Sequence, residues 1–411
     1  MEVVGGMGEA LVIVSNGFGT VSGPSIALFH TLRGLSKFFD EIYLLNTIRY
    51  TSSYDKAMLS YLPKNVNIID FMLHERPYTL VFLKESSQRK LFLGFREAMK
   101  RLRALVRGET YLLVMSDIFN LKSLSTCSDD RYYVGYNVFF NFAPPDVMLR
   151  QKVKHVNPWE TGEKIYKLLL SEAYRRIDLG VVKHVGHILA HTNYQRMFYN
   201  NYLGISDKNI TVIPHMIDVS LVQGLGHQGR IAPEGGSRIF FFSGRRTIEK
   251  GSYVLVRAFK KFSDRCRCDA RLVLVGDPPV CRELREVKEK LIFVRQRPYP
   301  DYLRLMSSVD VVLVPSQIEP FGLVVLEALS LGKAIVASNT GGIREIVDGL
   351  GALVEPGDEE ELAEAMEEAC KGSLGEERER YVERAWEFDV SRIAPLLYDD
   401  ILRNGSVDLG R

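Results

Sequence analysis

Short apolar segments alternate with helix-forming segments along most of this chain of 411 residues. The apolar segments are rich in Val, Ile, Leu and Phe, and few of them alternate apolar with polar residues, which is typical of parallel strands covered on both faces. The pattern predicts an α/β protein with two doubly wound, Rossmann-like domains. The expected strands are residues 11–16, 41–47, 65–70, 111–116, 132–138, 187–192 and 210–214 in the first half, and residues 238–244, 270–276, 291–296, 311–316, 333–338 and 352–356 in the second.

The length of the chain exceeds what one hydrophobic core supports and suits two domains. A Gly-containing segment, residues 219–236, separates the last strand of the first half from a strong new strand. We therefore expect an N-terminal domain at 1–218, a linker at 219–236, a C-terminal domain at 237–388 and a closing helix at 389–411.

Composition excludes several classes of protein. A net charge of +2 gives no basic surface for nucleic acid, and no apolar run reaches the length of a membrane-spanning helix. No basic residue precedes the first apolar run, which argues against a signal peptide. The five cysteines include no CxxC pair, so we expect reduced thiols and a cytoplasmic location, with peripheral contact to the inner membrane face as an option.

Polar and glycine residues gather where the expected strands end. In open α/β sheets, ligands bind beyond the carboxyl ends of the strands, so these positions predict a cleft between the two sheets. In the first half they are Asn16–Gly23, Asp117, Asn137–Asn141 and His191, and in the second half they are Arg245–Lys250, Gly276–Asp277, Ser316–Glu319 and Asn339–Gly342.

The segment EPFGLVVLE, residues 319–327, places two carboxylates around an apolar helix start. The amides of Phe321, Gly322, Leu323 and Val324 would form a helix N-terminus, which attracts phosphate. Glu327 lies one turn into the helix, and its carboxylate would suit a vicinal diol such as a ribose. Glu319 could accept hydrogen bonds from a second set of hydroxyls. The segment therefore predicts a site for a phosphate between two polyols.

The segment FFSGRRTIEKGS supplies the cations that such a ligand requires. Arg245 and Lys250 could together hold a diphosphate, one as a planar fork and the other as a point charge. The chain contains no DxD, no HExxH and no Cys/His zinc spacing. We therefore expect no metal and no cofactor, with Arg245, Lys250 and helix amides stabilising a departing diphosphate.

Three other segments allow alternative functions. GFGTVSG, ending at Gly23, contains a GxG that could indicate a dinucleotide site, but the next strand ends without an acidic residue. The three histidines of KHVGHILAHT could hold a metal, but no carboxylate or cysteine completes the set. Residues 83–109 could form a basic helix on an anionic membrane or an ordinary helix covering the first sheet.

The second half, from about Ser237 to Glu368, resembles the donor half of family 4 retaining glycosyltransferases, also called glycosyl transferases group 1. The resemblance rests on GRRTIEKGS, on the Glu319–Glu327 pair and on SNTGGIREIVDG. It implies the GT-B fold, in which two Rossmann-like domains face a central cleft and C-terminal helices cross back to the first domain.

The resemblance also implies residue roles. Arg245 and Lys250 correspond to the pair that grips the donor diphosphate, Glu319 to the carboxylate beside the donor sugar, and Glu327 to the ribose ligand. Residues 321–324 correspond to the amides that line the sugar and phosphate. Gly23 corresponds to a first-domain glycine that faces donor and acceptor across the cleft.

The first half departs from the family pattern. Asn141 stands where the family commonly has a histidine, and Pro214-His215-Met216 replaces the usual Pro-Asn-Gly. No first-domain catalytic residue is therefore assigned.

The sequence predicts a retaining, metal-independent glycosyltransferase of the hexosyltransferase type. It would move a sugar from a nucleoside-diphosphate sugar to an acceptor hydroxyl, with lipid-linked and polysaccharide acceptors as candidates. The alternatives are a nucleotide-sugar epimerase on the same fold and a non-catalytic protein that binds sugar nucleotides.

Overall fold

The computed structural model describes residues 9–15, 23–46, 57–70, 97–98, 100–102, 104–106, 109–115, 132–134, 185–227, 237–372 and 377–406. These residues fall into two compact units. The first contains the described residues up to 134, residues 185–216 and the C-terminal residues from 390. The second contains residues 217–389. Among the described residues, the chain passes from the first unit to the second after Met216 and returns after Asp389.

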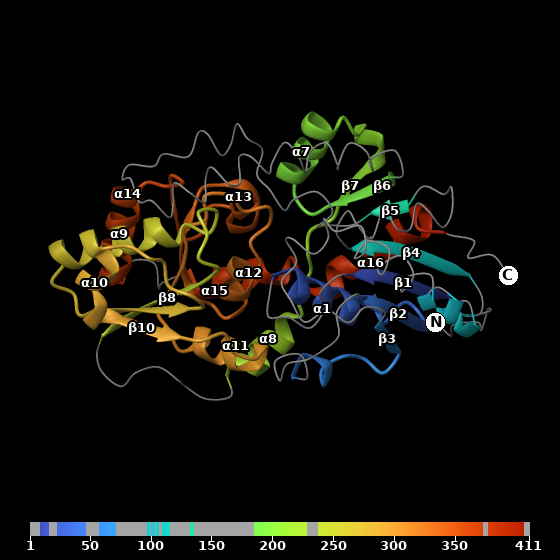
Figure 1. Cartoon of the computed structure of the whole chain (residues 1–411), viewed down its shortest axis with the longest axis horizontal. Coiled ribbons are helices and arrows are strands. Elements are labelled where there is room, and N and C mark those ends of the chain that lie inside the picture. The colour runs from blue at the N-terminus through green and yellow to red at the C-terminus, as the bar shows by residue number, and fades with distance from the viewer. Residues whose placement is uncertain are drawn as a thin grey trace. The chain divides into compact units, whose positions relative to one another are not determined.

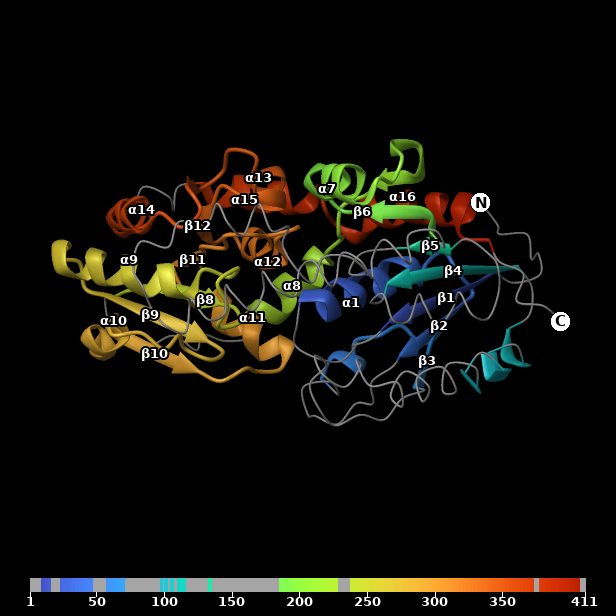
Figure 2. The ribbon, with the colours of Figure 1, turned by 45° about the horizontal axis from the view of Figure 1, so that its top comes forward.

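The first unit is built on a parallel sheet of seven strands, in the order β3-β2-β1-β4-β5-β6-β7. Figure 2 shows the first strands of this series side by side. The strand bounds are β1 Ala10–Ser15, β2 Glu41–Asn46, β3 Val66–Asp70, β4 Thr110–Met115, β5 Tyr132–Val134, β6 Val185–Ala190 and β7 Ile210–Val212.

The second unit has a parallel sheet of six strands, in the order β10-β9-β8-β11-β12-β13. The bounds are β8 Arg238–Ser243, β9 Ala270–Val275, β10 Leu291–Val294, β11 Val311–Val314, β12 Ala334–Ser338 and β13 Ala352–Val354. Every strand expected from the sequence is present within a few residues of its predicted position. The prediction of two doubly wound α/β units is confirmed.

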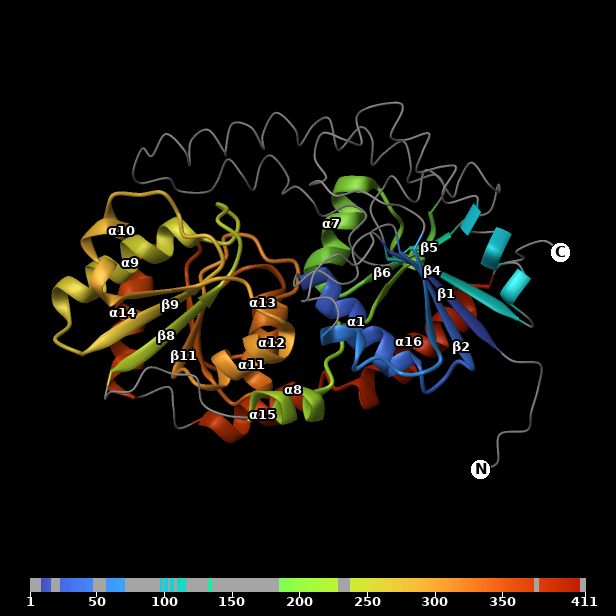
Figure 3. The ribbon, with the colours of Figure 1, turned by 60° about the horizontal axis from the view of Figure 1, so that its bottom comes forward.

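Helices cover both faces of the second sheet, which explains why β11 and β12 are buried along their whole length. Figure 3 shows α9 and α10 on one side of β8 and β9, and α11 and α12 on the other. The helices of this unit are α8 Val219–Gly226, α9 Ser252–Arg265, α10 Glu283–Glu286, α11 Tyr299–Ser307, α12 Leu323–Ser330, α13 Gly341–Val347, α14 Glu359–Lys371 and α15 Arg378–Trp386.

The C-terminal helix α16 (Val390–Asn404) belongs to the first unit, where it packs on α1 (Gly23–Leu35) and β4. Figure 1 shows this red helix among the blue elements of the N-terminal sheet. Tyr398 of α16 contacts the rings of Phe38 and Phe39, and the Leu112 amide donates to the Gly405 carbonyl at 2.8 Å. The helix expected to cross back from the second domain therefore completes the first core.

Part of the basic segment at 83–109 is also helical. Ala98 and Leu102 are buried in the core of the first unit, whereas Lys100 and Arg101 are exposed. This arrangement fits the covering helix rather than the membrane-bound one, because the apolar face is already occupied. Residues 83–96 lie outside the described residues. Within the part of the chain that the structure describes, no helix is long and apolar enough to cross a bilayer.

Two segments in which the described part of the chain passes between the units, around Ile217 and Asp389, are hydrogen-bonded to each other. The Ile217 amide donates to the Phe388 carbonyl at 2.9 Å, and the Val219 amide donates to Asp389 Oδ2 at 3.1 Å. Helix α8 follows at once, capped by Asp218, whose carboxylate accepts from the Leu221 amide. Residues 219–226, placed in the linker by the sequence, are therefore helical, because an N-cap and apolar residues make this glycine-containing segment a helix.

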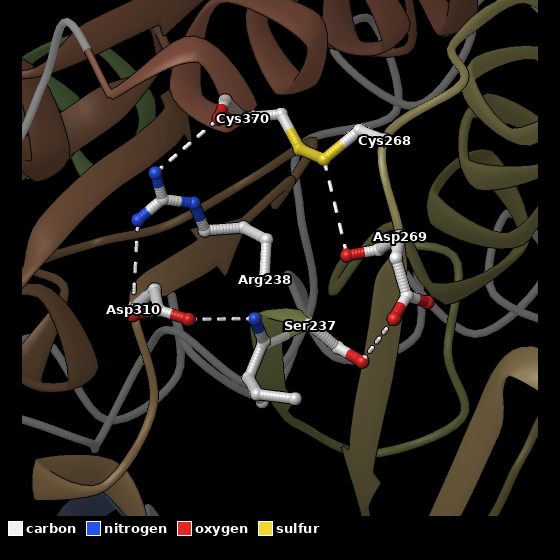
Figure 4. Close-up of a disulfide and its surroundings, with 7 residues drawn as sticks. Ser237, Arg238, Cys268, Asp269, Asp310 and Cys370 are labelled. Carbon is white, nitrogen blue, oxygen red and sulfur yellow. Dashed lines mark hydrogen bonds and ion pairs between the residues drawn. A yellow bond between two sulfur atoms is a disulfide. The ribbon is translucent and has the colours of Figure 1, made fainter. Parts of the chain in front are cut away.

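Two cysteines are paired, which corrects the expectation of reduced thiols only. Cys268 forms a disulfide with Cys370, 102 residues away in the chain, while Cys266 and Cys281 are free thiols. Figure 4 shows this bond among polar contacts. The spacing of the cysteines gave no indication of the pair, because the segment before β9 and the end of α14 meet only in the folded unit.

The disulfide lies at the amino edge of the second sheet. Arg238 starts β8, donates to the Cys370 carbonyl at 3.2 Å and pairs with Asp310, whose carboxylate accepts from the Ile239 amide at 2.7 Å (Figure 4). Cys268 precedes β9, and Asp310 precedes β11. Strands of four to six residues span roughly 13–20 Å, so the disulfide is remote from the carboxyl edge of this sheet.

Candidate functional site

The carboxyl edge of the second sheet contains the residues that the sequence analysis singled out. Strand order reverses between β8 and β11, which pair directly although β9 and β10 intervene in the chain. Such a reversal leaves a crevice beyond the strand ends, which is where open α/β sheets bind ligands. The loops that follow these two strands contain Arg245–Lys250 and Ser316–Glu319.

Lys250 and Glu319 form an ion pair at this reversal point. Lys250 Nζ lies 2.7 Å from Glu319 Oε2, and the Ser316 hydroxyl donates to the same oxygen at 3.2 Å. The lysine side chain is 29% exposed and the glutamate side chain 11%. The sequence analysis assigned these residues to different parts of one ligand, and the structure places them in direct contact.

The turn that carries Lys250 is bound tightly to the end of β11. The amides of Gln317 and Ile318 donate to the Glu249 carbonyl at 2.7 and 3.4 Å. Gly251 has φ +67°, and a Cβ on it would lie 1.8 Å from the Pro315 carbonyl oxygen. Only glycine tolerates this conformation and this approach, so the glycine allows Lys250 to reach Glu319.

The start of α12 packs equally closely against the next loop. Gly322 caps the helix with φ +113°, and its carbonyl accepts from the amides of Val325 and Leu326. The amides of Leu323 and Val324 precede these bonds, as expected for a helix N-terminus. The Gly342 amide donates to the Glu319 carbonyl at 2.9 Å. This hydrogen bond ties the loop after β12 to the Glu319 backbone.

Glu327 is the most deeply buried carboxylate of the predicted set. Its residue is 1% exposed, and its Oε2 atom accepts a hydrogen bond from the Tyr302 hydroxyl at 2.9 Å. Burial raises the pKa of Glu327 to about 7, although hydrogen bonds from Tyr302 and Tyr299 act in the opposite direction. Both tyrosines lie on α11, and the sequence did not predict them as site residues. Their spacing of three residues in YPDYLRLM was the available signal.

The remaining predicted residues of the second unit differ in their exposure to solvent. Arg245 follows β8 and is exposed, Phe321 is 3% exposed, and Leu323 and Val324 are half-buried. The Phe321 ring meets the Phe388 ring edge to face, with centroids 6.3 Å apart. Phe321 therefore anchors the loop in the core, while Arg245 is accessible to a ligand.

In the first unit, Gly23 is the exposed first residue of α1. Asp117, Asn141 and the loop residues 16–22 lie outside the described residues. His191 and His215 stack on each other with ring centroids 3.6 Å apart, and His191 Nδ1 donates to the Ile213 carbonyl at 2.7 Å. Burial lowers the pKa of His191 to about 4, and burial together with the neighbouring His191 lowers that of His215 well below its usual value, so both imidazoles are neutral near pH 7.

The histidines do not assemble a metal site in the described part of the chain. His187 lies 2.7 Å from the Thr211 hydroxyl, and no cluster of three His, Cys, Asp or Glu side chains among the described residues could hold an ion. The stacked pair was missed because His191 follows β6 and His215 follows β7, and only the sheet order brings the two strands together.

Two doubly wound units, with a C-terminal helix that follows the second unit in the chain but belongs to the first, define the GT-B fold. Solved structures support this conclusion. Sucrose-phosphate synthase of Thermosynechococcus elongatus matches with a TM-score of 0.72 at 17% identity, over 96% of this chain and 99% of that protein. The Anabaena protein HepE in complex with UDP-glucose matches with 0.66 at 17% identity, over 97% and 100%. Identities this low show the fold alone.

Residues 228–388 match the family model described as Glycosyl transferases group 1. The second unit therefore carries a glycosyl transferases group 1 domain, as the sequence resemblance implied.

Two relatives show how the sequence likeness is distributed. An uncharacterised glycosyltransferase of Methanocaldococcus jannaschii is 33% identical over 138 residues, or 32% of this chain and 35% of that protein. The lipopolysaccharide 1,2-N-acetylglucosaminetransferase of Salmonella typhimurium is 25% identical over 287 residues, or 64% and 70%. The chain thus spans about a third of the first relative and about two thirds of the second.

Proposed function

We propose that this protein is a glycosyltransferase that binds a nucleoside-diphosphate sugar at the carboxyl edge of the second sheet. The observation that carries the proposal is the Lys250–Glu319 pair at the reversal point between β8 and β11, beside the start of α12. A cation, a carboxylate and helix amides in one place match a donor with a diphosphate between two polyols. The names of the relatives support the same class of activity.

The residues of the site would contact three parts of the donor: the diphosphate, the transferred sugar and the ribose. Arg245, which is exposed, and Lys250 would hold the diphosphate together with the amides of Leu323 and Val324. Glu319 would accept hydrogen bonds from the hydroxyls of the transferred sugar, and Glu327 from those of the ribose. Binding would then require Lys250 to share its ammonium group between Glu319 and a phosphate oxygen.

The reaction would be a metal-independent transfer with retention of configuration. The bond between the anomeric carbon and the phosphate oxygen breaks, and a bond from the anomeric carbon to the acceptor oxygen forms on the same face. The acceptor proton passes to the leaving phosphate oxygen, so no separate general base is needed. Arg245 and Lys250 stabilise the negative charge that develops on the diphosphate, where a preformed positive field contributes most.

The first unit, with Gly23 at the start of α1, would bind the acceptor. A lipid-linked or polysaccharide hydroxyl is the acceptor class we propose, because the Salmonella relative is named for a reaction on lipopolysaccharide. Peripheral membrane contact through residues 83–109 is a weaker proposal, since Ala98 and Leu102 already pack in the protein core.

Acceptor-dependent release of nucleoside diphosphate tests the proposal. UDP- and GDP-linked sugars and ADP-glucose are each supplied with simple sugars or a lipid-phosphate extract. Release that needs one donor and an acceptor, and that is lost in Glu319→Ala but kept in the remote control Glu368→Ala, would support a transferase. Isomerised donor without release would indicate an epimerase, and binding without turnover a non-catalytic protein. Either outcome would overturn the proposal.

A further inference from the structure

Glu327 is a buried carboxylate whose surroundings differ from those of the other buried acids in the second unit. Glu359, which is equally buried, pairs with Arg257 at 2.6 Å. Among the described residues, no cation lies within ion-pair distance of Glu327. Its carboxylate instead accepts from neutral phenols: the Tyr302 hydroxyl donates to Oε2, and the Tyr299 hydroxyl also acts on this group. A buried carboxylate normally pairs with a cation, so Glu327 is only partly compensated by the protein.

The hydrogen bonding of the second carboxylate oxygen of Glu327, Oε1, differs from that of Oε2. Oε1 is inaccessible to solvent, and no donor within the described residues lies at hydrogen-bond distance from it. A carboxylate oxygen in this condition costs free energy unless another molecule supplies a donor or the group holds a proton. The hydroxyls of a ligand would supply such a donor. Alternatively, Glu327 would hold a proton and stay in the core as a neutral carboxylic acid.

Tyr302 is held rigidly where it meets Glu327. It is 4% exposed, its ring lies nearly parallel to that of Tyr299 at 18° with centroids 6.1 Å apart, and it contacts Phe241 of β8 at 5.9 Å. The Ser243 hydroxyl, at the end of β8, hydrogen-bonds to the same phenol. Tyr302 therefore joins the end of β8 to α12, the two elements that border the proposed donor site.

We propose that Tyr302 is a positioning residue for donor binding: it holds Oε2 of Glu327 so that Oε1 faces the hydroxyls of the donor's ribose. This inference rests on the proposed function. The phenol donates only one hydrogen bond, so it orients the carboxylate without filling the second oxygen. It also favours the ionised carboxylate, the form that accepts from both hydroxyls of a diol.

The titratable groups around this carboxylate make the proposal measurable. Tyr302 and Tyr299 approach Glu327 from α11, and Asp218, beside α8, acts on Tyr299. Tyr302 lowers the pKa of Glu327, which burial raises to about 7. Without the phenol, the carboxylate should ionise only at higher pH, and donor affinity should follow it.

The test compares Tyr302→Phe with wild type and with Tyr381→Phe, which removes a hydroxyl from another buried tyrosine of the same unit. Binding of UDP-glucose, GDP-mannose and ADP-glucose, and of the 2′-deoxyribose form of whichever binds, is measured by calorimetry from pH 6 to 9. Wild-type affinity should rise about tenfold from pH 6 to pH 8, because a carboxylate with a pKa near 7 ionises over this range. Tyr302→Phe should raise the pH at which half of this gain in affinity is reached, and it should weaken binding at pH 7 by about five- to tenfold. It should also reduce the preference for ribose over 2′-deoxyribose.

The outcomes separate the inference from the function on which it rests. Wild-type protein that binds none of the three donors would overturn the proposed function and this inference with it. Wild-type binding with an unchanged pH midpoint and an unchanged ribose preference in Tyr302→Phe would overturn the inference alone and leave Tyr302 as a packing residue. If Tyr302→Phe does not fold, Ser243→Ala is the second variant. It weakens the Tyr302 hydroxyl as a hydrogen-bond donor and should shift the pH midpoint of donor binding in the same direction. No shift there would also count against the proposal.

Discussion

The Lys250 ammonium lies 2.7 Å from the Glu319 carboxylate, across the point where strand order in the second sheet reverses. The contact pairs the two opposite charges, so neither is left unpaired where its side chain is largely buried. Because the lysine is still partly exposed, an anion can approach it without first breaking the pair. We therefore interpret the pair as a preformed diphosphate site.

Replacing Lys250 with methionine should affect turnover much more than stability. The neutral side chain keeps the length but removes the charge that stabilises the leaving diphosphate, so turnover should fall by about 100-fold or more. The free energy of unfolding should change by about 1 kcal/mol or less, because the ion pair is partly exposed. Diphosphate release and urea unfolding measure the two effects.

Lys260→Met is the matched control for this prediction, since Lys260 also pairs with carboxylates and is 27% exposed, but lies on α9. Similar turnover losses in both variants would remove Lys250 from the proposed mechanism.

Glu327→Gln should stabilise the protein at alkaline pH and not at acidic pH. The folded-state pKa of about 7 lies above the unfolded value of 4.5, so stability from this group is present below pH 4.5 and is lost as pH rises through 7. The loss amounts to roughly 3 kcal/mol at about 1.4 kcal/mol per unit. Glutamine carries no proton to lose. Thermal unfolding at pH 4 and pH 8 should therefore show a gain at pH 8 only, and an equal gain at both would refute the raised pKa.

Gly251→Ala should disrupt the turn that carries Lys250. An alanine there must adopt φ +67° and place its Cβ 1.8 Å from the Pro315 oxygen. The conformation alone costs about 1 kcal/mol, and the steric clash adds to it by displacing the end of β11. Gly204→Ala isolates the first effect, because Gly204 has φ +69° and a methyl group added there would meet no atom within 4 Å. Equal losses of unfolding free energy in the two variants would show that the close approach is unimportant.

Reduction of the Cys268–Cys370 disulfide should lower stability without abolishing donor binding. Closing a loop of 102 residues constrains the unfolded chain, and such bonds contribute about 2–4 kcal/mol. The bond lies at the amino edge of the second sheet, away from the proposed donor residues. Cys268→Ser should unfold at a lower temperature than wild type under non-reducing conditions, while Cys281→Ser, which alters a free thiol, provides the control. Identical melting of oxidised and reduced wild type would contradict the prediction.

Local patterns in the sequence were sufficient for the strands. The middle of β8 and the whole of β11 are apolar because helices cover both faces of a parallel sheet, and this requirement is visible in a single segment. The glycines that follow several strands mark their ends for an equally local reason. Together these features predicted both α/β units and the edge at which the polar residues gather.

The contacts among those residues depended on the tertiary structure. Tyr302 meets Glu327 and Lys250 meets Glu319 because α11, α12 and the loop after β8 converge at the reversal of strand order. His191 meets His215, and Cys268 meets Cys370, for similar reasons. Residue type and spacing determined which segments form strands and helices. Which side chains touch was decided by the order of strands in each sheet, since that order brings together residues that no local pattern relates.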